Sequence, residues 1–463
     1  MQNDTICAIS TAQGGAIGVI RVSGPHAIEA VADIFVPIGG KPLKERRNFS
    51  LTFGKIFSNG GEIIDEVLVS IFRAPHSYTG EDSVEISCHG SSYILQRVVH
   101  LLIEHGCRLA EPGEYTQRAF LNGKMDLSQA EAVADLIASS SASTHRLAMS
   151  QMRGGFSKEL SQLRDKLLHL TSLMELELDF SDHEELEFAD RTELSQIADD
   201  IERTVSRLAN SFSVGNAIKN GVPVAIIGET NAGKSTLLNA LLNEEKAIVS
   251  DVHGTTRDVI EDTINLRGIT FRFIDTAGIR QTSDVVESIG IERTFQKMSQ
   301  ADIVLWMIDS ENNTDWETLK SDILPHCEGK SLIILFNKAD KVSSNRLSEL
   351  NKAFEDVVDT PKLFLSAKNH TGMDELETLL VETAALPEIS QNDVIVTYIR
   401  HYEALVRALD SIHRVQGGLQ MNLSGDFVSQ DLRECIHHLS DIVGDVSTDS
   451  VLQNIFRYFC IGK

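Results

Sequence analysis

The stretch GETNAGKS, residues 228–235, constrains the fold of this 463-residue chain more than any other part of its sequence. It fits the pattern G-x-x-x-x-G-K-[ST] and lies between the apolar run VAII and the helical pattern TLLNALLN. In such a strand, loop and helix unit, backbone N–H groups and the positive end of the helix bind phosphate. The sequence therefore predicts an α/β domain in which Lys234 reaches the phosphate oxygens and Ser235 can bind Mg²⁺.

Three further motifs follow apolar runs typical of strands, and they indicate which nucleotide is bound. The motif DTAG (275–278) follows ITFRFI, NKAD (337–340) follows SLIILF, and SAK (366–368) follows KLFL. A carboxylate at Asp340 can accept two hydrogen bonds from guanine, whereas adenine presents no such pair of donors. The ordered set predicts a GTPase. The residues expected to bind GTP are Asn231, Ala232, Gly233, Lys234, Ser235, Thr236, Thr255, Thr256, Asp275, Gly278, Asn337, Lys338, Asp340, Ser366 and Ala367.

The residue after DTAG is Ile279, where Ras-like GTPases have a glutamine that orients the attacking water. An apolar side chain cannot orient water, so either another group does so or the domain is a slow hydrolase that acts mainly as a switch. Arg280, Asp284 and Glu287 are the nearby candidates, with a solvated charge on a switch loop as the alternative for each. Asn231 in the phosphate loop could help to hold a monovalent cation that supplies positive charge.

The rest of the chain predicts two other kinds of structure. The first 120 residues contain β-prone runs (GVIRVSG, SLTFGKI, EVLVSIF and SVEISCHG) and one helical stretch, SSYILQRVVHLLIEHG, which together predict an α+β domain. A helical seam then follows, and helical periodicity returns in DVIVTYIRHYEALVRALDSIHRV and SQDLRECIHHLSDIVG. The seam consists of Leu160, Leu163, Leu167, Leu170 and Met174.

Helices on both sides of the α/β block predict a discontinuous helical domain with the GTPase domain inserted into it. We place the N-terminal domain at 1–120, the two helical parts at 121–215 and 385–463, and the GTPase domain at 216–384. No apolar run approaches the roughly 20 residues needed to span a bilayer, and the six cysteines show no metal spacing, so we expect a cytoplasmic location. The net charge of −25 argues against a surface broadly adapted to nucleic acid, although it leaves room for a local basic patch.

Over its whole length the chain resembles the MnmE (TrmE) family of tRNA modification GTPases, within the TrmE-Era-EngA-like GTPases. The resemblance rests on the phosphate loop with Asn231, on GTTRD (254–258) and DTAGIR, on the N-terminal GVIRVSGP, SYTGEDSVEISCHG and PGEYTQRAFLNGKMDLSQAEA, and on the terminal CIGK. It implies modification of wobble uridine at C5, with the FAD- and NADH-using partner MnmG and a one-carbon unit from 5-formyl- or 5,10-methylene-tetrahydrofolate. It also implies a homodimer that forms a heterotetramer or larger complex with MnmG.

The resemblance also implies roles for individual residues. Mg²⁺ would be held by Ser235 and Thr256, and K⁺ by Asn231 and Thr255 with the backbone of Ser250 and Val252. Glu287 would position the attacking water. Folate would be bound by Arg21, Glu85, Lys124 and Lys463. Cys460 is either a nucleophile or acid in one-carbon transfer or a small packed helix residue. The alternative function is a GTP-switched RNA or ribosome assembly factor, and a weaker one is a folate enzyme with a regulatory GTPase insert.

Overall fold

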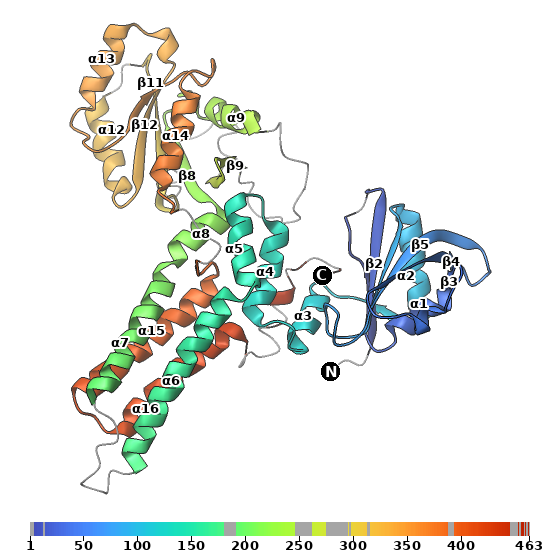
Figure 1. Ribbon diagram of the computed structural model, residues 1–463. Coiled ribbons are helices and arrows are strands. Elements are labelled where there is room, and N and C mark those ends of the chain that lie inside the picture. The colour runs from blue at the N-terminus through green and yellow to red at the C-terminus, as the bar shows by residue number, and fades with distance from the viewer. Residues whose placement is uncertain are drawn as a thin grey trace. The chain divides into compact units, whose positions relative to one another are not determined.

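The computed structural model divides the chain into two compact units (Figure 1). Unit 1 comprises residues 1–138, 148–206 and 403–463, and unit 2 comprises residues 139–147 and 207–402. The structure describes residues 4–12, 14–179, 191–245, 262–274, 295, 298–312, 315–387, 393–444, 452, 455–457, 459 and 462. In these ranges every helix is too short or too polar to cross a membrane. The fourfold division of the chain given above stays a prediction.

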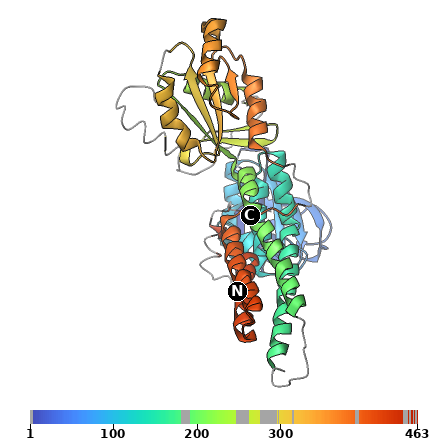
Figure 2. The ribbon, with the colours of Figure 1, turned by 90° about the vertical axis from the view of Figure 1, so that its left-hand side faces the viewer.

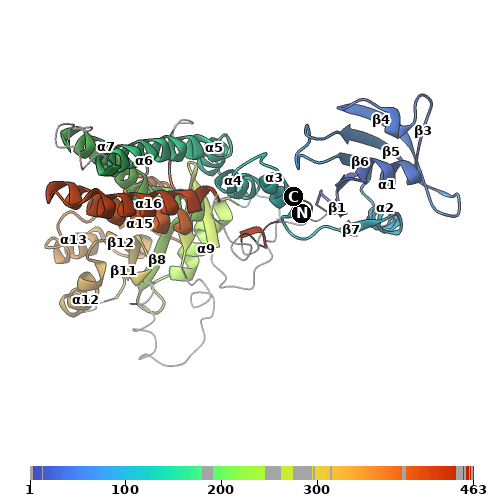
Figure 3. The same ribbon diagram turned by 90° about the horizontal axis from the view of Figure 1, so that it is seen from below.

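Unit 1 begins with a seven-stranded sheet of order β3-β4-β5-β6-β2-β1-β7. Along β5, alternate side chains point into the core because successive residues of a strand face opposite sides. The helices α1 (Ala27–Ile34) and α2 (Ser92–Glu104) pack against that apolar face (Figure 3). The strands are β1 (Thr5–Ile9), β2 (Ile17–Ser23), β3 (Phe35–Pro37), β4 (Ser50–Phe57), β5 (Ile63–Phe72), β6 (Ser83–His89) and β7 (Cys107–Leu109). The predicted strands and the predicted helix of this region are therefore confirmed.

The helices of unit 1 come from two segments far apart in the sequence. The predicted leucine seam lies on α6 (Gly155–Asp179), and all five of its side chains are buried. Helix α6 packs along α16 (Gly425–Val443), and Glu175 accepts a hydrogen bond from Arg433 at 2.6 Å. Figure 2 shows these long helices running side by side. Shorter helices complete this region, namely α3 (Glu114–Leu121), α4 (Leu127–Ala138) and α5 (Ala142–Met152), the last of which begins in unit 2.

Two helices run across the division between the units. Helix α7 (Arg191–Asn210) leads into unit 2, and α15 (Ile399–Gln420) leads back into unit 1. Within unit 1 they run antiparallel, since Asp199 accepts a hydrogen bond from Gln416 at 2.7 Å and Glu202 lies 3.8 Å from His413. The chain therefore leaves and re-enters unit 1 on neighbouring helices.

Unit 2 is built on a six-stranded sheet of order β13-β12-β11-β8-β10-β9, in which only β9 runs antiparallel to its neighbour among the described strands. Helices cover both faces: α9 and α14 contribute to one core, and α12 and α13 to the other. The strands are β8 (Val222–Gly228), β9 (Asp262–Leu266), β10 (Ile269–Phe273), β11 (Ile303–Asp309), β12 (Ser331–Asn337) and β13 (Lys362–Phe364). The helices are α8 (Phe212–Asn220), α9 (Lys234–Glu245), α12 (Trp316–Ile323), α13 (Ser344–Ala353) and α14 (Met373–Ala384).

One predicted helix begins later than its periodicity indicates. Helical spacing extends back to Asp393, but α15 starts at Ile399 and residues 393–398 are not helical. This run is rich in β-branched residues, which favour extended backbone. Val396 is fully buried, and its N–H donates to Ser211 Oγ at 3.0 Å. Tertiary packing therefore overrides the local helical pattern here.

Candidate functional site

The phosphate loop of unit 2 follows β8 at the point where the sheet order reverses, which is where open α/β sheets bind ligands. Two of its glycines have positive φ angles, +140° at Gly228 and +101° at Gly233. A Cβ atom at Gly228 would lie 2.1 Å from the carbonyl oxygen of Met307, and one at Gly233 would lie 2.2 Å from Asn337 Nδ2. Both positions therefore require glycine for steric as well as conformational reasons.

The residues that follow Gly233 open helix α9, so their N–H groups lie at its positive end. Lys234 Nζ donates to the carbonyl oxygens of Gly228 and Glu229, at 2.7 Å each, which holds the ammonium group against the loop. Ser235 is half-buried and Thr236 is exposed. Asn231 is exposed, with a φ of +67°, and Ala232 is buried.

Asn337, at the end of β12, joins three predicted GTP-binding motifs. Its Nδ2 donates to the carbonyl oxygen of Ala232 at 2.7 Å, and its Oδ1 accepts from the N–H of Ala367 at 3.0 Å. Its side chain is only 3% exposed, and both hydrogen bonds are buried. The amide therefore fixes the phosphate loop to the two loops expected to contact guanine.

Asp340 and Ser366, from the two expected guanine-binding loops, also come together. A hydrogen bond from Ser366 is the main reason why the pKa of Asp340 lies below its ordinary value, and Asn369 Nδ2 donates to the same carboxylate at 2.9 Å. Asp340 itself is exposed, so its carboxylate is ionised and open to a ligand. An acceptor placed in this way suits the N–H donors of a guanine edge.

Lys338 makes an ion pair that the sequence did not indicate. It adopts a φ of +60°, and its ammonium group pairs with Asp309 and lies 3.7 Å from Glu311. The hydrogen bond to Asp309 raises the pKa of Lys338. Asp309 is the last residue of β11, the parallel neighbour of β12. Ligand sites gather at the carboxyl ends of parallel strands, and this rule could have identified Asp309 from the sequence.

In unit 1, Arg21 and Glu85 face each other across neighbouring strands. They are register partners on β2 and β6, and Arg21 donates to Glu85 Oε1 at 2.8 and 3.0 Å. The guanidinium carbon of Arg21 lies 5.4 Å from the ring centroid of Tyr78 and 5.6 Å from that of Tyr115, within the range of cation–π attraction. Tyr115 Oη also donates to the carbonyl oxygen of Arg21 at 2.7 Å. Both the backbone and the head group of Arg21 are thus held in place.

Lys124 lies against the loop that carries Tyr78. Its Nζ donates to the carbonyl oxygen of Pro75 at 2.9 Å, and its side chain also passes beside Gly80. The C-terminal tail returns to the same sheet, because the carbonyl oxygen of Gly462 accepts a hydrogen bond from Ser10 Oγ at 3.1 Å. The structure thus brings Arg21 and Glu85 into contact, and Lys124 is bonded to the loop whose Tyr78 contacts Arg21.

Several predicted site residues lie outside the residues that the structure describes. They are Ser250, Val252, Thr255, Thr256, Asp275, Gly278, Ile279, Arg280, Asp284, Glu287, Cys460 and Lys463.

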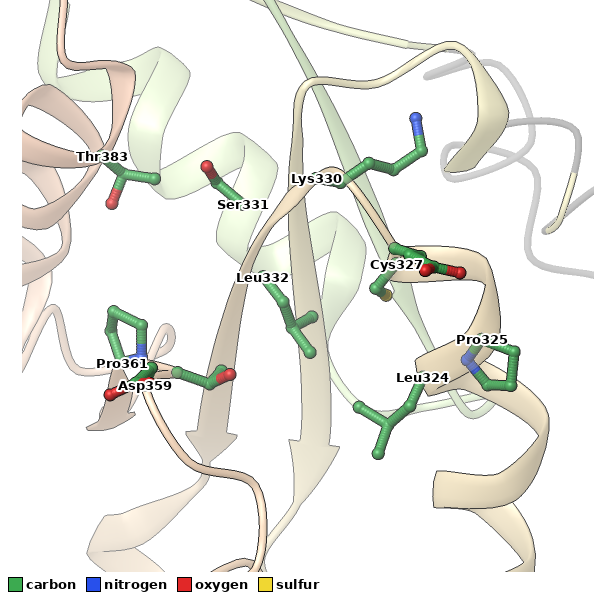
Figure 4. A pocket seen from close by; sticks show the side chains of 11 residues that line it. Leu324, Pro325, Cys327, Lys330, Ser331, Leu332, Asp359, Pro361 and Thr383 are labelled. Carbon is green, nitrogen blue, oxygen red and sulfur yellow. The ribbon is translucent and has the colours of Figure 1, made fainter.

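Unit 2 also holds a cavity of about 640 Å³ that includes no predicted site residue. Figure 4 shows its lining, to which Ser331 and Leu332 contribute from the start of β12. The phosphate loop follows the carboxyl end of the parallel strand β8, so the cavity lies at the opposite edge of the sheet. We therefore do not assign the nucleotide to it.

Comparisons with known proteins cover the whole chain. A family model described as the MnmE helical domain matches residues 127–460, and one described as the GTP-binding protein TrmE N-terminus matches residues 5–124. Curated relatives named tRNA modification GTPase MnmE include those of Phocaeicola vulgatus (68% identical, covering 100% of this chain and 99% of the relative) and Bacteroides fragilis (69%, 100% of both). Among solved structures, the G domain of the T. maritima FeoB iron transporter is 28% identical, covering 35% of this chain and 98% of that one with a TM-score of 0.25.

Proposed function

The chain belongs to the MnmE family of tRNA modification GTPases, and from that premise we propose how its parts take part in modifying tRNA. It is a GTPase that acts in tRNA modification. Together with MnmG, it adds an aminomethyl or carboxymethylaminomethyl group to C5 of the wobble uridine. The new carbon comes from 5-formyl- or 5,10-methylene-tetrahydrofolate, and the work is done in the cytoplasm.

The observation that carries GTP binding is the pair of buried hydrogen bonds made by Asn337. They hold the phosphate loop, the Asp340 loop and the Ala367 loop together as one cradle. A preorganised cradle loses little conformational entropy on binding. The carboxylate of Asp340 accepts hydrogen bonds from the guanine edge. The ammonium group of Lys234 moves from the loop carbonyls to the phosphates, and the N–H groups at the start of α9 donate hydrogen bonds to the same phosphates.

Two cations are part of the proposal, and the described residues fit them. Ser235 is half-buried beside Lys234 at the start of α9, so its hydroxyl suits Mg²⁺, a hard cation that takes oxygen ligands. Asn231 is exposed and offers an amide oxygen for K⁺, with Thr255, Ser250 and Val252 as its further ligands. When bound, the cations offset the charge that develops on the phosphates. Thr256 completes the Mg²⁺ ligands, and Glu287 positions the attacking water.

Folate binding is assigned to Arg21, Glu85, Lys124 and Lys463, with Cys460 as a group for one-carbon transfer. Three observations support this assignment: the ion pair between Arg21 and Glu85, the contact of Lys124 with the Tyr78 loop, and the return of the tail to Ser10. Arginine and lysine suit the glutamate carboxylates of folate, and a glutamate suits the aminopyrimidine edge of the pterin. The carboxylate of Glu85 has to exchange part of its pairing with Arg21 for that edge.

We also propose that the chain forms a homodimer through its N-terminal domain. The sheet face opposite α1 and α2 carries large apolar side chains that remain exposed, including Leu51 (62%), Phe53 (46%) and Leu68 (40%). Exposed apolar area of this kind is typical of a protein interface. The dimer then associates with MnmG and tRNA as a heterotetramer or larger complex.

The proposal is tested by measuring GTP hydrolysis in KCl and in NaCl at matched ionic strength, over a range of protein concentrations. We expect K⁺ to stimulate the rate, and the stimulation to grow with concentration as GTPase domains meet. Asn231→Gly should abolish the stimulation without straining the backbone, because φ is +67° there. The matched control is Asn422→Gly, which changes an exposed asparagine with a φ of +53° in unit 1 and should leave the stimulation intact.

The alternative function, a GTP-switched RNA or ribosome assembly factor, predicts different results. Rates would be slow and equal in both salts, and the full-length protein would show no affinity for 5-formyl-tetrahydrofolate. Under our proposal the protein binds this folate, and Arg21→Gln weakens binding at least tenfold. Unchanged folate affinity in Arg21→Gln would overturn the assignment of that site.

A further inference from the structure

A cluster of cationic side chains stands apart in this acidic protein. Residues 38–49 connect β3 to β4 (Figure 3), and this connection carries four cations. A fifth, Arg73, follows β5 and bonds to the same connection. We call these five side chains the basic cluster: Lys41, Lys44, Arg46, Arg47 and Arg73. Only one carboxylate, Glu45, lies within the connection, while the whole chain has a net charge of −25.

The guanidinium groups of the basic cluster bond to neutral carbonyl oxygens. Arg46 donates to the carbonyl oxygens of Lys41 and Gly39, at 2.9 and 3.1 Å. Arg73 donates to those of Lys44 and Arg46, at 2.7 and 3.3 Å. A carbonyl oxygen leaves the positive charge of a guanidinium in place, whereas a carboxylate neutralises it. These bonds therefore shape the connection without cancelling its charge.

No ion pair between the basic cluster and a carboxylate occurs among the residues that the structure describes. Cations elsewhere commonly have such partners: Lys55 pairs with Glu66 at 3.0 Å, and Arg414 pairs with Asp431 at 2.7 Å. A surface that keeps five cations without carboxylate partners in an acid-rich chain maintains a local positive potential. Such a potential attracts an anionic partner.

Several contacts hold the backbone of the connection in one shape. Leu43, within the 3₁₀ turn Leu43–Glu45, is only 2% exposed and anchors the connection in the core below the sheet. Asn48 Oδ1 accepts from the N–H groups of Arg73 and Phe49, at 2.9 Å each. The side chains of Lys41, Lys44 and Arg47 remain exposed. A partner therefore meets a backbone that is already in place and does not have to order a loose loop.

An aromatic ring stands beside the basic cluster. Phe49 is 69% exposed and packs edge-on against Phe72, with ring centroids 6.0 Å apart. Cations together with an exposed aromatic ring suit RNA, because phosphates pair with the cations and an unstacked base can stack on the ring. A strand of RNA therefore uses both features of this surface, the cations and the ring.

We propose that the basic cluster and Phe49 form an RNA-binding surface that docks the phosphate backbone of the tRNA substrate. The inference rests on the proposed function, which supplies tRNA as the nucleic acid. Arg73 begins the loop that carries Tyr78, the residue stacked on Arg21. Five residues of extended chain span at most about 18 Å, so a tRNA bound at Arg73 lies near the candidate folate site.

The test measures binding of an unmodified tRNA transcript to the full-length protein at several salt concentrations. Its main variant is Lys41→Gln, Lys44→Gln and Arg47→Gln combined, which leaves every hydrogen bond described above intact. We expect tRNA affinity to fall at least tenfold near 0.1 M salt, and the slope of log K against log salt to decrease by about 2 to 3, since each lost phosphate contact removes about 0.7 to 0.9.

The matched control combines Arg153→Gln, Lys158→Gln and Lys352→Gln, which removes the same charge from exposed positions elsewhere. It should keep the wild-type salt slope. Phe49→Leu preserves apolar packing against Phe72 but removes the ring, and it should weaken binding about fivefold or more with an unchanged slope, whereas Phe49→Tyr should bind as wild type.

Each other outcome overturns the inference. Equal tRNA affinity and an equal salt slope in the wild type and the main variant would overturn the inference but leave the proposed function intact. Retained tRNA binding with loss of co-elution with MnmG would reassign the surface to a protein partner. GTP hydrolysis and folate binding are measured on the same variants and should stay at wild-type levels. If the wild-type protein itself neither hydrolysed GTP nor bound folate, the proposed function would have failed instead.

Discussion

At the scale of single residues, Asn337 shows how one amide can organise a nucleotide site. Its two buried hydrogen bonds connect loops that lie 105 and 30 residues away in the sequence. The nearby Gly233 has no room for a side chain because Asn337 Nδ2 occupies that space. The asparagine of NKAD thus acts through the protein's own loops as well as through any contact with nucleotide.

We predict that Asn337→Ala lowers both stability and GTP affinity. The substitution leaves the carbonyl of Ala232 and the N–H of Ala367 buried without their partner, at a cost of about 1–3 kcal/mol each. Urea unfolding of the nucleotide-free protein should show the loss in the transition of unit 2. Reduced GTP affinity with unchanged unfolding would instead mean that the side chain serves the nucleotide alone.

At the scale of elements, a charge network attaches helix α3 to the N-terminal sheet. Glu114 on α3 is only 5% exposed and accepts hydrogen bonds from Arg108 on β7 and from Arg118 one turn along. Arg118 also reaches Asp4 and Glu81. Burial raises the pKa of Glu114, but the bonds from Arg108, the Glu111 N–H and Arg118 outweigh burial, so its pKa is lowered.

This network predicts a pH dependence. Because the folded-state pKa of Glu114 lies below its ordinary value near 4.5, the unfolded chain takes up a proton first, and the stabilisation is lost as pH falls from about 4.5 through the lower folded value. Glu114→Gln should cost about 3 kcal/mol at pH 7 and flatten this acid dependence. Urea unfolding at a series of pH values measures both effects. The exposed control Glu62→Gln should change neither.

The leucine seam of α6 supplies a second prediction at the element scale. Leu167 is fully buried, while its neighbour Leu168 is 46% exposed. Leu167→Ala should therefore reduce the free energy of unfolding by about 2–5 kcal/mol, and Leu168→Ala by well under 1 kcal/mol. Denaturant titration of both variants provides the comparison, and equal losses would refute the assignment of the buried face.

At the scale of the whole molecule, the antiparallel pairing of α7 with α15 means that residues 207–402 of unit 2 are inserted between neighbouring helices. We predict that replacing residues 211–398 with a short Gly/Ser linker leaves unit 1 folded, because the linker only has to join the ends of two paired helices. Circular dichroism would measure the helix content of the shortened protein, and urea titration would show whether it unfolds cooperatively. Loss of cooperative unfolding would show that unit 1 depends on unit 2.

Sequence patterns predicted the long elements well, because alternation along β5 and the seam of α6 are local signals. Short or non-local features were harder to predict. Strand β7 has three residues, too few for periodicity, and it pairs with β1 some 100 residues away. At the nucleotide site the loop motifs were readable, but the pairing of Lys338 with Asp309 depends on neighbouring strands, which only the sheet order reveals.

The split origin of the helical part has a consequence for synthesis on the ribosome. Glu175 of α6 and Arg433 of α16 are bonded, yet 258 residues separate them. At about 5–20 residues per second, roughly 13 to 50 seconds pass between the emergence of the two helices. During that interval the N-terminal sheet can form and unit 2 can fold, while the leucines of α6 lack the packing that α16 provides. The nascent chain therefore presents an apolar helix to chaperones until its last segment is translated.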